Sequence, residues 1–162
     1  MKKIIILIPV FLLALFASCK KDSKTPATSG TYYVKFQFNG GEKQYSASTS
    51  GILGSSAAPD GCEIIGYGSG SNPPGVTISI LDNSAIVINK TYTQTLEEIT
   101  YVDESGNSYV AGSAYKSTSF AIIIEEITSD HIKGTFSARF QEGGTSTFIN
   151  ATEGQFYVNR LQ

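Results

Sequence analysis

Few residues in this chain have the types that nucleophilic or metal chemistry requires. The 162 residues include one histidine, His131, and two cysteines, Cys19 and Cys62. A single histidine excludes zinc sites built from several histidines, although one is enough to activate a serine or cysteine nucleophile. His131 follows Ser129 and Asp130 in a polar turn, which favours a solvent-exposed ring, and the sequence has no Gly-x-Ser-x-Gly motif. We therefore expect no catalytic residue.

Two loop sequences resemble ligand-binding loops but lack an essential part. Asp103–Asn107 carries alternating polar residues like the first ligands of a calcium loop, yet Ala114 stands where the bidentate acid belongs. Glycines alternate from Gly66 to Gly70, but two prolines and another predicted strand follow them. A phosphate loop needs a helix at that point, because the helix amides bind the phosphate. Both segments are interpreted as connections between strands, and we expect no metal and no cofactor.

Two pairs of adjacent acids, Glu97-Glu98 and Glu125-Glu126, are the only hint of hydrolytic chemistry. A glycosidase needs two carboxylates that face each other across about 5–10 Å. Adjacent residues on a strand point to opposite faces, so neither pair forms such a dyad by itself. We expect these acids to solvate the strands and protect their edges.

The start of the chain has the pattern of an export signal. Lys2 and Lys3 precede an apolar run of 13 residues, Ile4–Phe16, which is shorter than the roughly 20 residues that a membrane-spanning helix needs. The small residues Ala17-Ser18 then stand directly before Cys19. This arrangement resembles the lipobox of bacterial lipoproteins, which implies lipid on Cys19 and cleavage after residue 18. The alternative is an ordinary secretory signal with an unmodified cysteine.

Lipidation at Cys19 has consequences for the rest of the chain. Stable attachment to a membrane needs at least two acyl chains, and lipoprotein maturation supplies two or three on one residue. Residues 19–30 are polar or small and are predicted to be a flexible tether, and 31–162 are predicted to be a single domain. Cys62 is then left without a disulfide partner, and we expect it to be a small buried hydrophobic residue.

The charge of the mature chain argues against nucleic acid as a partner. Loss of residues 1–18 removes Lys2 and Lys3, which leaves 144 residues with ten basic against fourteen acidic side chains. A mildly acidic chain of mixed sign argues against nucleic acid or anionic lipid as a partner. The predicted location is the cell envelope, with the lipid in the outer membrane and the domain at its periplasmic face or at the cell surface.

Residues from Gly30 onward predict an all-β fold. Short runs rich in Tyr, Phe, Ile, Val and Thr alternate with clusters of Gly, Asn, Asp and Ser. Asn39-Gly40-Gly41 predicts a tight hairpin, and Ser50–Gly61 is predicted to be a loop. The predicted strands are Thr31–Phe38, Glu42–Thr49, Cys62–Tyr67, Val76–Leu81, Ala85–Ile88, Lys90–Thr95, Glu98–Val102, Ser108–Tyr115, Ser119–Ile127, His131–Gln141, Thr145–Ile149 and Gly154–Asn159.

We expect about nine or ten of these segments to form an antiparallel meander, folded as a β-sandwich or a flattened up-and-down barrel. In His131–Gln141, Ile132 and Phe136 share one face with other apolar residues, whereas Lys133 and Arg139 lie on the opposite, polar face. Exposed tyrosines are candidates for stacking on sugars or apolar ligands, namely Tyr33, Tyr67, Tyr109 and Tyr115.

Several short segments resemble small uncharacterised lipoprotein families of Bacteroidota. They are Phe36-x-Phe38-Asn39-Gly40, Thr77–Ile80, Lys90–Thr93, Gly134–Ala138 and Ala151–Phe156. The resemblance implies an all-β domain at the cell envelope and implies no particular reaction. The sequence thus predicts a non-enzymatic envelope lipoprotein that binds a protein, a glycan or a small apolar ligand. The alternative is a hydrolase of envelope or extracellular polymers whose carboxylates are brought together by the fold.

Overall fold

The computed structural model describes residues 31–54, 60–81, 84–93, 97–115 and 117–162. The predicted signal peptide, Cys19 and the tether therefore lie outside the described residues. Thr31–Gln162 forms one compact unit. No helix long and apolar enough to cross a membrane is found in the described part of the chain.

The all-β prediction is confirmed, because every regular element of the described residues is a strand. The eleven strands form one mostly antiparallel sheet. They are β1 (Tyr33–Phe38), β2 (Gly41–Tyr45), β3 (Ser48–Leu53), β4 (Cys62–Tyr67), β5 (Gly75–Ile80), β6 (Thr91–Tyr92), β7 (Glu97–Val102), β8 (Ser108–Gly112), β9 (Ser119–Ile127), β10 (His131–Glu142) and β11 (Phe148–Leu161).

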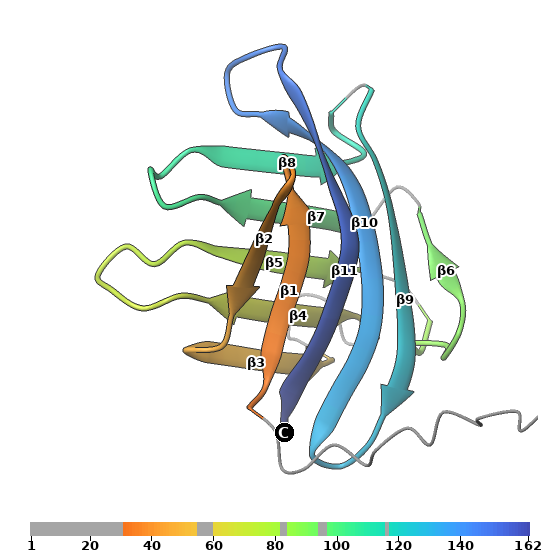
Figure 1. Ribbon diagram of the computed structural model, residues 1–162. Helices are drawn as coiled ribbons and strands as arrows, with labels where there is room; N and C mark the ends of the chain where they lie inside the picture. Colours follow the sequence, from red (N-terminus) through yellow and green to blue (C-terminus); the bar gives the residue numbers. More distant parts are fainter. Residues whose placement is uncertain (1–30, 55–59, 82–83, 94–96, 116) are drawn as a thin grey trace, which may run out of the picture. The chain divides into compact units, whose positions relative to one another are not determined.

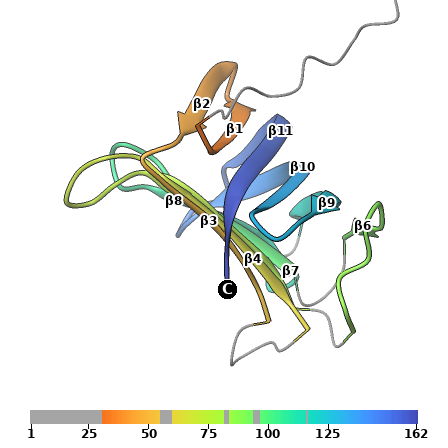
Figure 2. The same cartoon turned by 90° about the horizontal axis from the view of Figure 1, so that it is seen from below.

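The sheet folds into two layers whose strands run crosswise (Figure 1). One layer has the order β2-β1-β11-β10-β9-β6, and the other has the order β3-β4-β5-β7-β8. The view from below separates the two layers (Figure 2). The long strands β10 and β11 join them, since β10 also pairs with β8 and the end of β11 pairs with β3. Both a sandwich and a flattened barrel are compatible with this arrangement.

Aromatic rings pack together in one part of the interior between the layers, beside buried aliphatic side chains. Phe38 lies 4.7 Å from the ring centroid of Tyr101 and 4.9 Å from that of Tyr109, and Phe36 lies 5.2 Å from Tyr101. The hydroxyl of Tyr45 donates a hydrogen bond of 3.2 Å to the hydroxyl of Tyr101, so the polar ends of these two buried rings satisfy each other. Edge-to-face packing of this kind gives a dense core with specific geometry.

Local sequence signals predicted several elements correctly. The first hairpin is confirmed, and its turn residues Asn39 and Gly40 have φ angles of 49° and 77°. Both angles are positive, as a two-residue turn that matches the twist of the strands requires. The predicted bounds of β4 and β9 agree with the structure. In β10 the side chains predicted to be apolar and inward are buried.

Four predictions of local structure were wrong. Glu42–Thr49 was predicted as one strand, but it divides between β2 and β3, which lie in different layers. Part of the predicted loop Ser50–Gly61 belongs to β3, whose residues alternate little in polarity. Ala85–Ile88 forms no strand. Thr145–Ile149 and Gly154–Asn159 were predicted as two strands, but from Phe148 onward they belong to the single strand β11, which continues through a bulge. The turn-like sequence Thr-Glu-Gly in that bulge caused the error.

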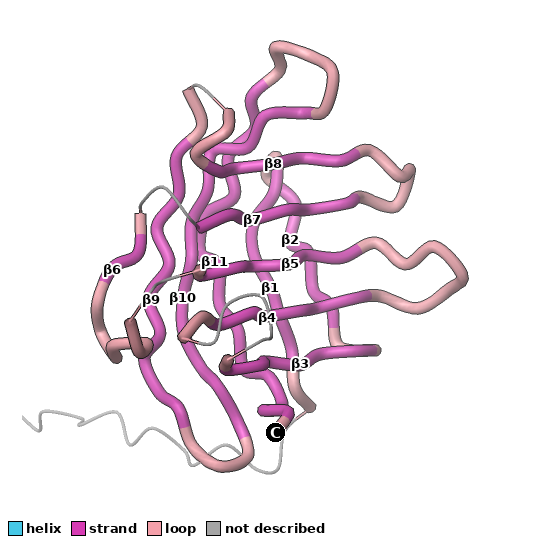
Figure 3. The backbone as a smooth tube through the Cα atoms, turned by 180° about the vertical axis from the view of Figure 1, so that it is seen from behind, coloured by secondary structure: helices cyan, strands magenta, loops and turns pink. Residues whose placement is uncertain are grey.

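The chain follows a meander except where β6 pairs with β9, where β8 pairs with β10 and where β11 is inserted beside β3. Strands β3 to β5 and then β7 and β8 are neighbours in chain order, as are β9, β10 and β11. The last strand, β11, then lies between β1 and β3 and runs parallel to β3. Figure 3 shows the β3–β8 layer in front of β1, β11 and β10. This insertion brings the two ends of the domain together.

Candidate functional site

The candidate site is the outer face of β1, β11, β10 and β9, which is the side of these strands that points away from the core. Strand alternation sends every second residue to this face. One row across the strands contains Lys35, Gln155 and Thr135, which are partners in the sheet register. The next rows add Gln37 beside Thr152, and Arg139 beside Asn150. The outer face is thus rich in amide, hydroxyl and charged groups, and the carboxylates of Glu125, Glu126 and Glu153 accompany its cations.

Aromatic rings gather at one end of the outer face. Tyr157 of β11 lies 5.3 Å from Tyr32 and 6.4 Å from Tyr33, measured between ring centroids. The imidazole of His131 lies 4.8 Å from the same ring. Tyr32 also donates a hydrogen bond of 3.2 Å to the backbone oxygen of Asp130. These contacts hold three tyrosines and the histidine as one partly exposed surface, which we call the aromatic end.

His131 is less exposed than the sequence suggested. Its side chain is 15% exposed, because Tyr157 covers one side of the ring. The Thr128 hydroxyl lies 3.0 Å from Nδ1, and Glu126 lies 3.5 Å from Nε2. Cys62, the one cysteine among the described residues, is buried in the core, whereas His131 lies on the outer face. His131 therefore does not serve Cys62 as a catalytic base.

The middle of the outer face is hollowed because its floor consists of small side chains. One hollow of about 340 Å³ is lined by residues that include Ala121, Ser137 and Thr152. A second hollow of about 370 Å³ shares Ala121 and Ser137, and a third of about 510 Å³ shares Thr152. Neighbouring hollows share lining residues, so they lie side by side across β9, β10, β11 and β1, and together we call them the groove.

A β-bulge in β11 shapes the groove. Thr152 and Glu153 together face Ser137 of β10, because the register shifts at this point. Glu153 has a φ of 55°, a left-handed conformation that is unfavourable for a residue with a side chain. As a result, two successive side chains of β11 are exposed at the groove. Bulges that redirect side chains occur preferentially beside functional sites.

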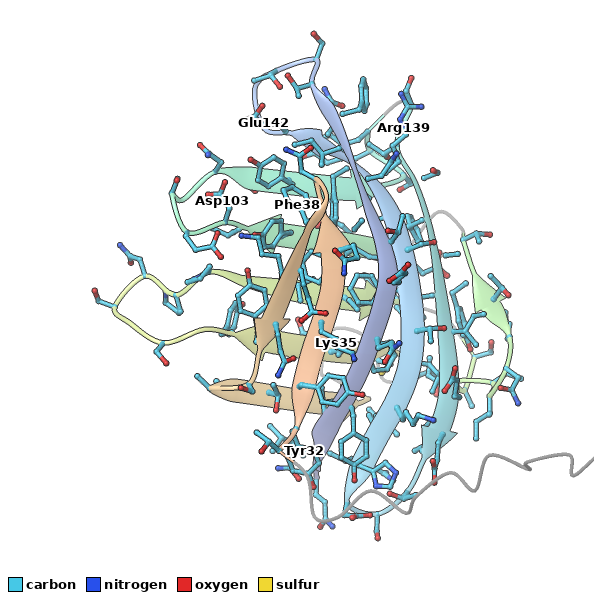
Figure 4. All side chains as sticks on the ribbon, viewed as in Figure 1. Tyr32, Lys35, Phe38, Asp103, Arg139 and Glu142 are labelled. Atoms are coloured by element: carbon cyan, nitrogen blue, oxygen red, sulfur yellow. The ribbon has the colours of Figure 1, made fainter. Side chains whose placement is uncertain are left out.

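Two cations on the outer face lie over aromatic rings. The guanidinium carbon of Arg139 is 4.6 Å from the ring centroid of Phe148, and Lys35 Nζ is 5.4 Å from that of Tyr33. Figure 4 places Arg139 at one end of the layer and Tyr32 at the other, with Lys35 between them. Neither cation has a carboxylate within ion-pair distance among the described residues, whereas Lys133 pairs with Glu125 at 3.2 Å.

Cys62 is buried as predicted, at 3% exposure. Burial, together with the charge of Glu63, raises the pKa of its thiol to about 12. The thiolate is the reactive form of cysteine. Cys62 is therefore an inert core residue near neutral pH.

The Asp103 loop is stabilised by its own hydrogen bonds. Asp103 Oδ1 accepts bonds from the backbone amides of Ser105 (2.8 Å) and Asn107 (2.9 Å), and Oδ2 accepts one from Tyr109 (3.1 Å). Partial burial opposes ionisation of Asp103, but these bonds outweigh it and lower its pKa. The loop is a structural turn. No group of three or more potential metal ligands occurs among the described residues.

The two acidic pairs differ in geometry. Glu97 is buried and Glu98 is exposed, as alternation predicts. The prediction was wrong for Glu125 and Glu126, because a register shift in β9 turns both toward the outer face. Glu125 contacts Lys133 and Glu126 contacts His131, so each carboxylate of this pair has a basic partner.

The tyrosine candidates lie in different environments. Tyr33 belongs to the aromatic end described above, whereas Tyr67 lies on β4 of the other layer and bonds to Thr77. Tyr115 is 38% exposed. Tyr109 was predicted to be exposed but is 5% exposed, because its ring joins the core beside Phe38.

The sequence did not identify Tyr157 as a site residue, nor the cation–π contact of Arg139 with Phe148. A signal for Tyr157 was present, since it stands between the inward residues Phe156 and Val158. Nothing in the sequence showed that β11 lies between β1 and β10, and this neighbourhood creates the site.

The chain matches no protein-family model, no curated protein and no solved structure.

Proposed function

We propose that the protein is a non-enzymatic lipoprotein of the cell envelope that binds its ligand on the outer face of β1, β11, β10 and β9. Lipid on Cys19 holds the chain at the outer membrane. The alternating face of the sheet presents the binding surface. The Bacteroidota lipoproteins that the sequence resembles supply the expectation of an envelope location.

One observation carries the binding proposal. The aromatic rings around Phe38 and Tyr101 pack closely against one another, so this part of the core is an unfavourable place for a bound apolar molecule. The outer face, in contrast, combines an open groove with packed aromatic rings and polar side chains. Convergence of polar and aromatic groups at a hollow is typical of binding sites.

A photo-crosslinking amino acid at position 152 tests the location of the binding surface. Thr152 is exposed in the groove. The matched control is position 79, because Ser79 lies on the outer face of the other layer. We expect illumination of cells that produce the full chain to shift the mass of the variant at 152 and to leave the variant at 79 unchanged. Equal labelling at the two positions, or none at 152, contradicts the proposal.

A further inference from the structure

We propose that the ligand is a linear glycan that contains uronic acids and lies along the outer face from the aromatic end to Arg139. This inference rests on the proposed function and adds the chemical class of the ligand. Three features of the outer face support it, namely the aromatic end, the polar groove and the two cations on rings.

The aromatic end suits the apolar face of a sugar ring. Tyr33 and Tyr157 are partly exposed, and Tyr157 is held in place by Tyr32 and His131. A tyrosine offers a rigid apolar surface and a hydroxyl at its rim, so it contacts the C–H groups and the hydroxyls of a sugar together. Because the rings are already packed, little side-chain entropy is lost when a ligand binds.

The middle of the groove suits the hydroxyl groups of a glycan. Gln155, Thr135 and Asn150 present amide and hydroxyl groups over a floor of small side chains. Amides and hydroxyls each donate and accept hydrogen bonds, as sugar hydroxyls do. An extended peptide recognises sheets differently, because it adds to the backbone of an edge strand. The groove crosses the face of interior strands, so it favours a glycan over a peptide.

The two cations on rings indicate carboxylates on the ligand. Lys43 and Lys133 each have a carboxylate partner, at 2.9 Å and 3.2 Å, whereas Arg139 and Lys35 have none among the described residues. A guanidinium binds a carboxylate through two parallel hydrogen bonds. The guanidinium of Arg139 lies over the ring of Phe148, and because Arg139 is exposed its donors are accessible to such a partner. The sugars that carry carboxylates are uronic acids.

Two polymers with the same sugar backbone test this inference. The purified full chain in mild detergent is titrated with polygalacturonate and with fully methyl-esterified polygalacturonate, which lacks the negative charge. We expect saturable binding of polygalacturonate and at least tenfold weaker binding of the ester. Arg139→Gln should weaken polygalacturonate binding about tenfold, since a charge-assisted hydrogen bond is lost. Tyr157→Ala should weaken the binding of both polymers.

The control is Lys43→Gln, which removes the same charge as Arg139→Gln but lies on β2 and pairs with Glu104. We expect it to bind polygalacturonate like the original chain. Equal losses in Arg139→Gln and Lys43→Gln indicate nonspecific attraction and overturn the inference. Equal binding of both polymers shows that the ligand is a neutral glycan, and it overturns the proposal that the ligand contains uronic acids. If neither polymer binds while crosslinking at position 152 succeeds, the glycan class is wrong and the binding surface stands.

Discussion

At the residue scale, burial changes the chemistry that the sequence offers. Cys62 has the residue type of a nucleophile, but its place in the core raises the pKa of the thiol to about 12. The buried tyrosines Tyr45 and Tyr101 also have raised pKa values, for which burial is again the largest cause. Because burial raises these pKa values, the stability of the fold depends on pH in the alkaline range.

We predict that the free energy of unfolding falls as the pH rises above about 9. The unfolded Cys62 loses its proton near pH 9, whereas the folded one keeps it until about 12. The folded state therefore binds more protons in this range, so a rise in pH favours unfolding, and Tyr45 and Tyr101 act in the same direction. Guanidinium denaturation of the purified chain at pH 8, 9 and 10 measures the effect.

Replacing Cys62 shows how much its thiol contributes to the pH dependence of the unfolding free energy. Cys62→Ala should show a smaller decrease in the denaturation midpoint between pH 8 and 10 than the original chain. Its absolute stability at pH 8 is expected to be lower, because the substitution leaves a small cavity. Identical pH slopes for the two chains would show that Cys62 does not contribute.

At the element scale, alternation and turn residues explain most of what could be predicted from the sequence. The hairpin at Asn39-Gly40 and the two faces of β10 follow from turn chemistry and side-chain alternation, which act within one strand or between two neighbouring strands. Elements governed by long-range contacts were missed. The segment Ser48–Leu53 becomes a strand because β4 and β11 pair with it from both sides. Its own residues provide little strand signal.

The close packing of β4 against β1 across the core requires a glycine at position 66. An added Cβ would lie 2.5 Å from Cγ2 and 2.7 Å from Cβ of Val34. Gly66→Ala should therefore destabilise the chain by about 1–3 kcal/mol through overpacking, as a lower thermal midpoint. Gly41→Ala is the control, since its Cβ would meet only Phe38 O at 3.7 Å.

A double-mutant cycle tests whether the contact with Val34 causes the loss of stability in Gly66→Ala. A Val34→Ala background removes the contact with Cγ2 and leaves only that with Cβ, so Gly66→Ala should cost less there than in the original chain. An equal cost in both backgrounds would contradict close packing of β4 against β1 as the reason for glycine at this position.

The bulge of β11 is expected to store strain at the binding surface. Glu153→Gly should stabilise the chain by about 0.5–1 kcal/mol, because glycine avoids the left-handed penalty but has more freedom when unfolded. Gln155→Gly, two residues further on in regular strand, should instead lower stability by about 0.5–1 kcal/mol. Thermal unfolding of the two variants compares them directly. A loss of stability in both would show that Glu153 makes contacts that outweigh its strain.

At the scale of the whole molecule, the proposed binding surface is a product of topology. Its parts come from the first strand and from the last three, and they meet only because β11 pairs with both β1 and β10. The sequence predicted that Lys133 and Arg139 point outward, yet it contained no sign that Tyr33 and Tyr157 are neighbours. Such juxtapositions depend on pairings between residues more than one hundred positions apart, which local periodicity does not encode.

The proposed attachment to a membrane would depend on Cys19, a residue far from this surface in the sequence. We predict that Cys19→Ser moves the chain from the membrane fraction to the soluble fraction and abolishes labelling with radioactive palmitate in the cells that make it. The serine hydroxyl is not a substitute for the thiol that receives the diacylglyceryl group, and two or more acyl chains are needed for stable anchoring. Fractionation and the mass of the purified chain measure both effects.

Cys62→Ser is the matched control, because it changes the other cysteine to the same residue. Cys62 is buried in the core and is therefore inaccessible to a lipid-transferring enzyme in the folded domain. The Cys62→Ser chain should remain in the membrane fraction, keep its palmitate label and lose only conformational stability. If the Cys19→Ser chain also stays at the membrane with its lipid mass, Cys19 is not the anchor. The outer face of β1, β11, β10 and β9 would then be tethered by another part of the chain.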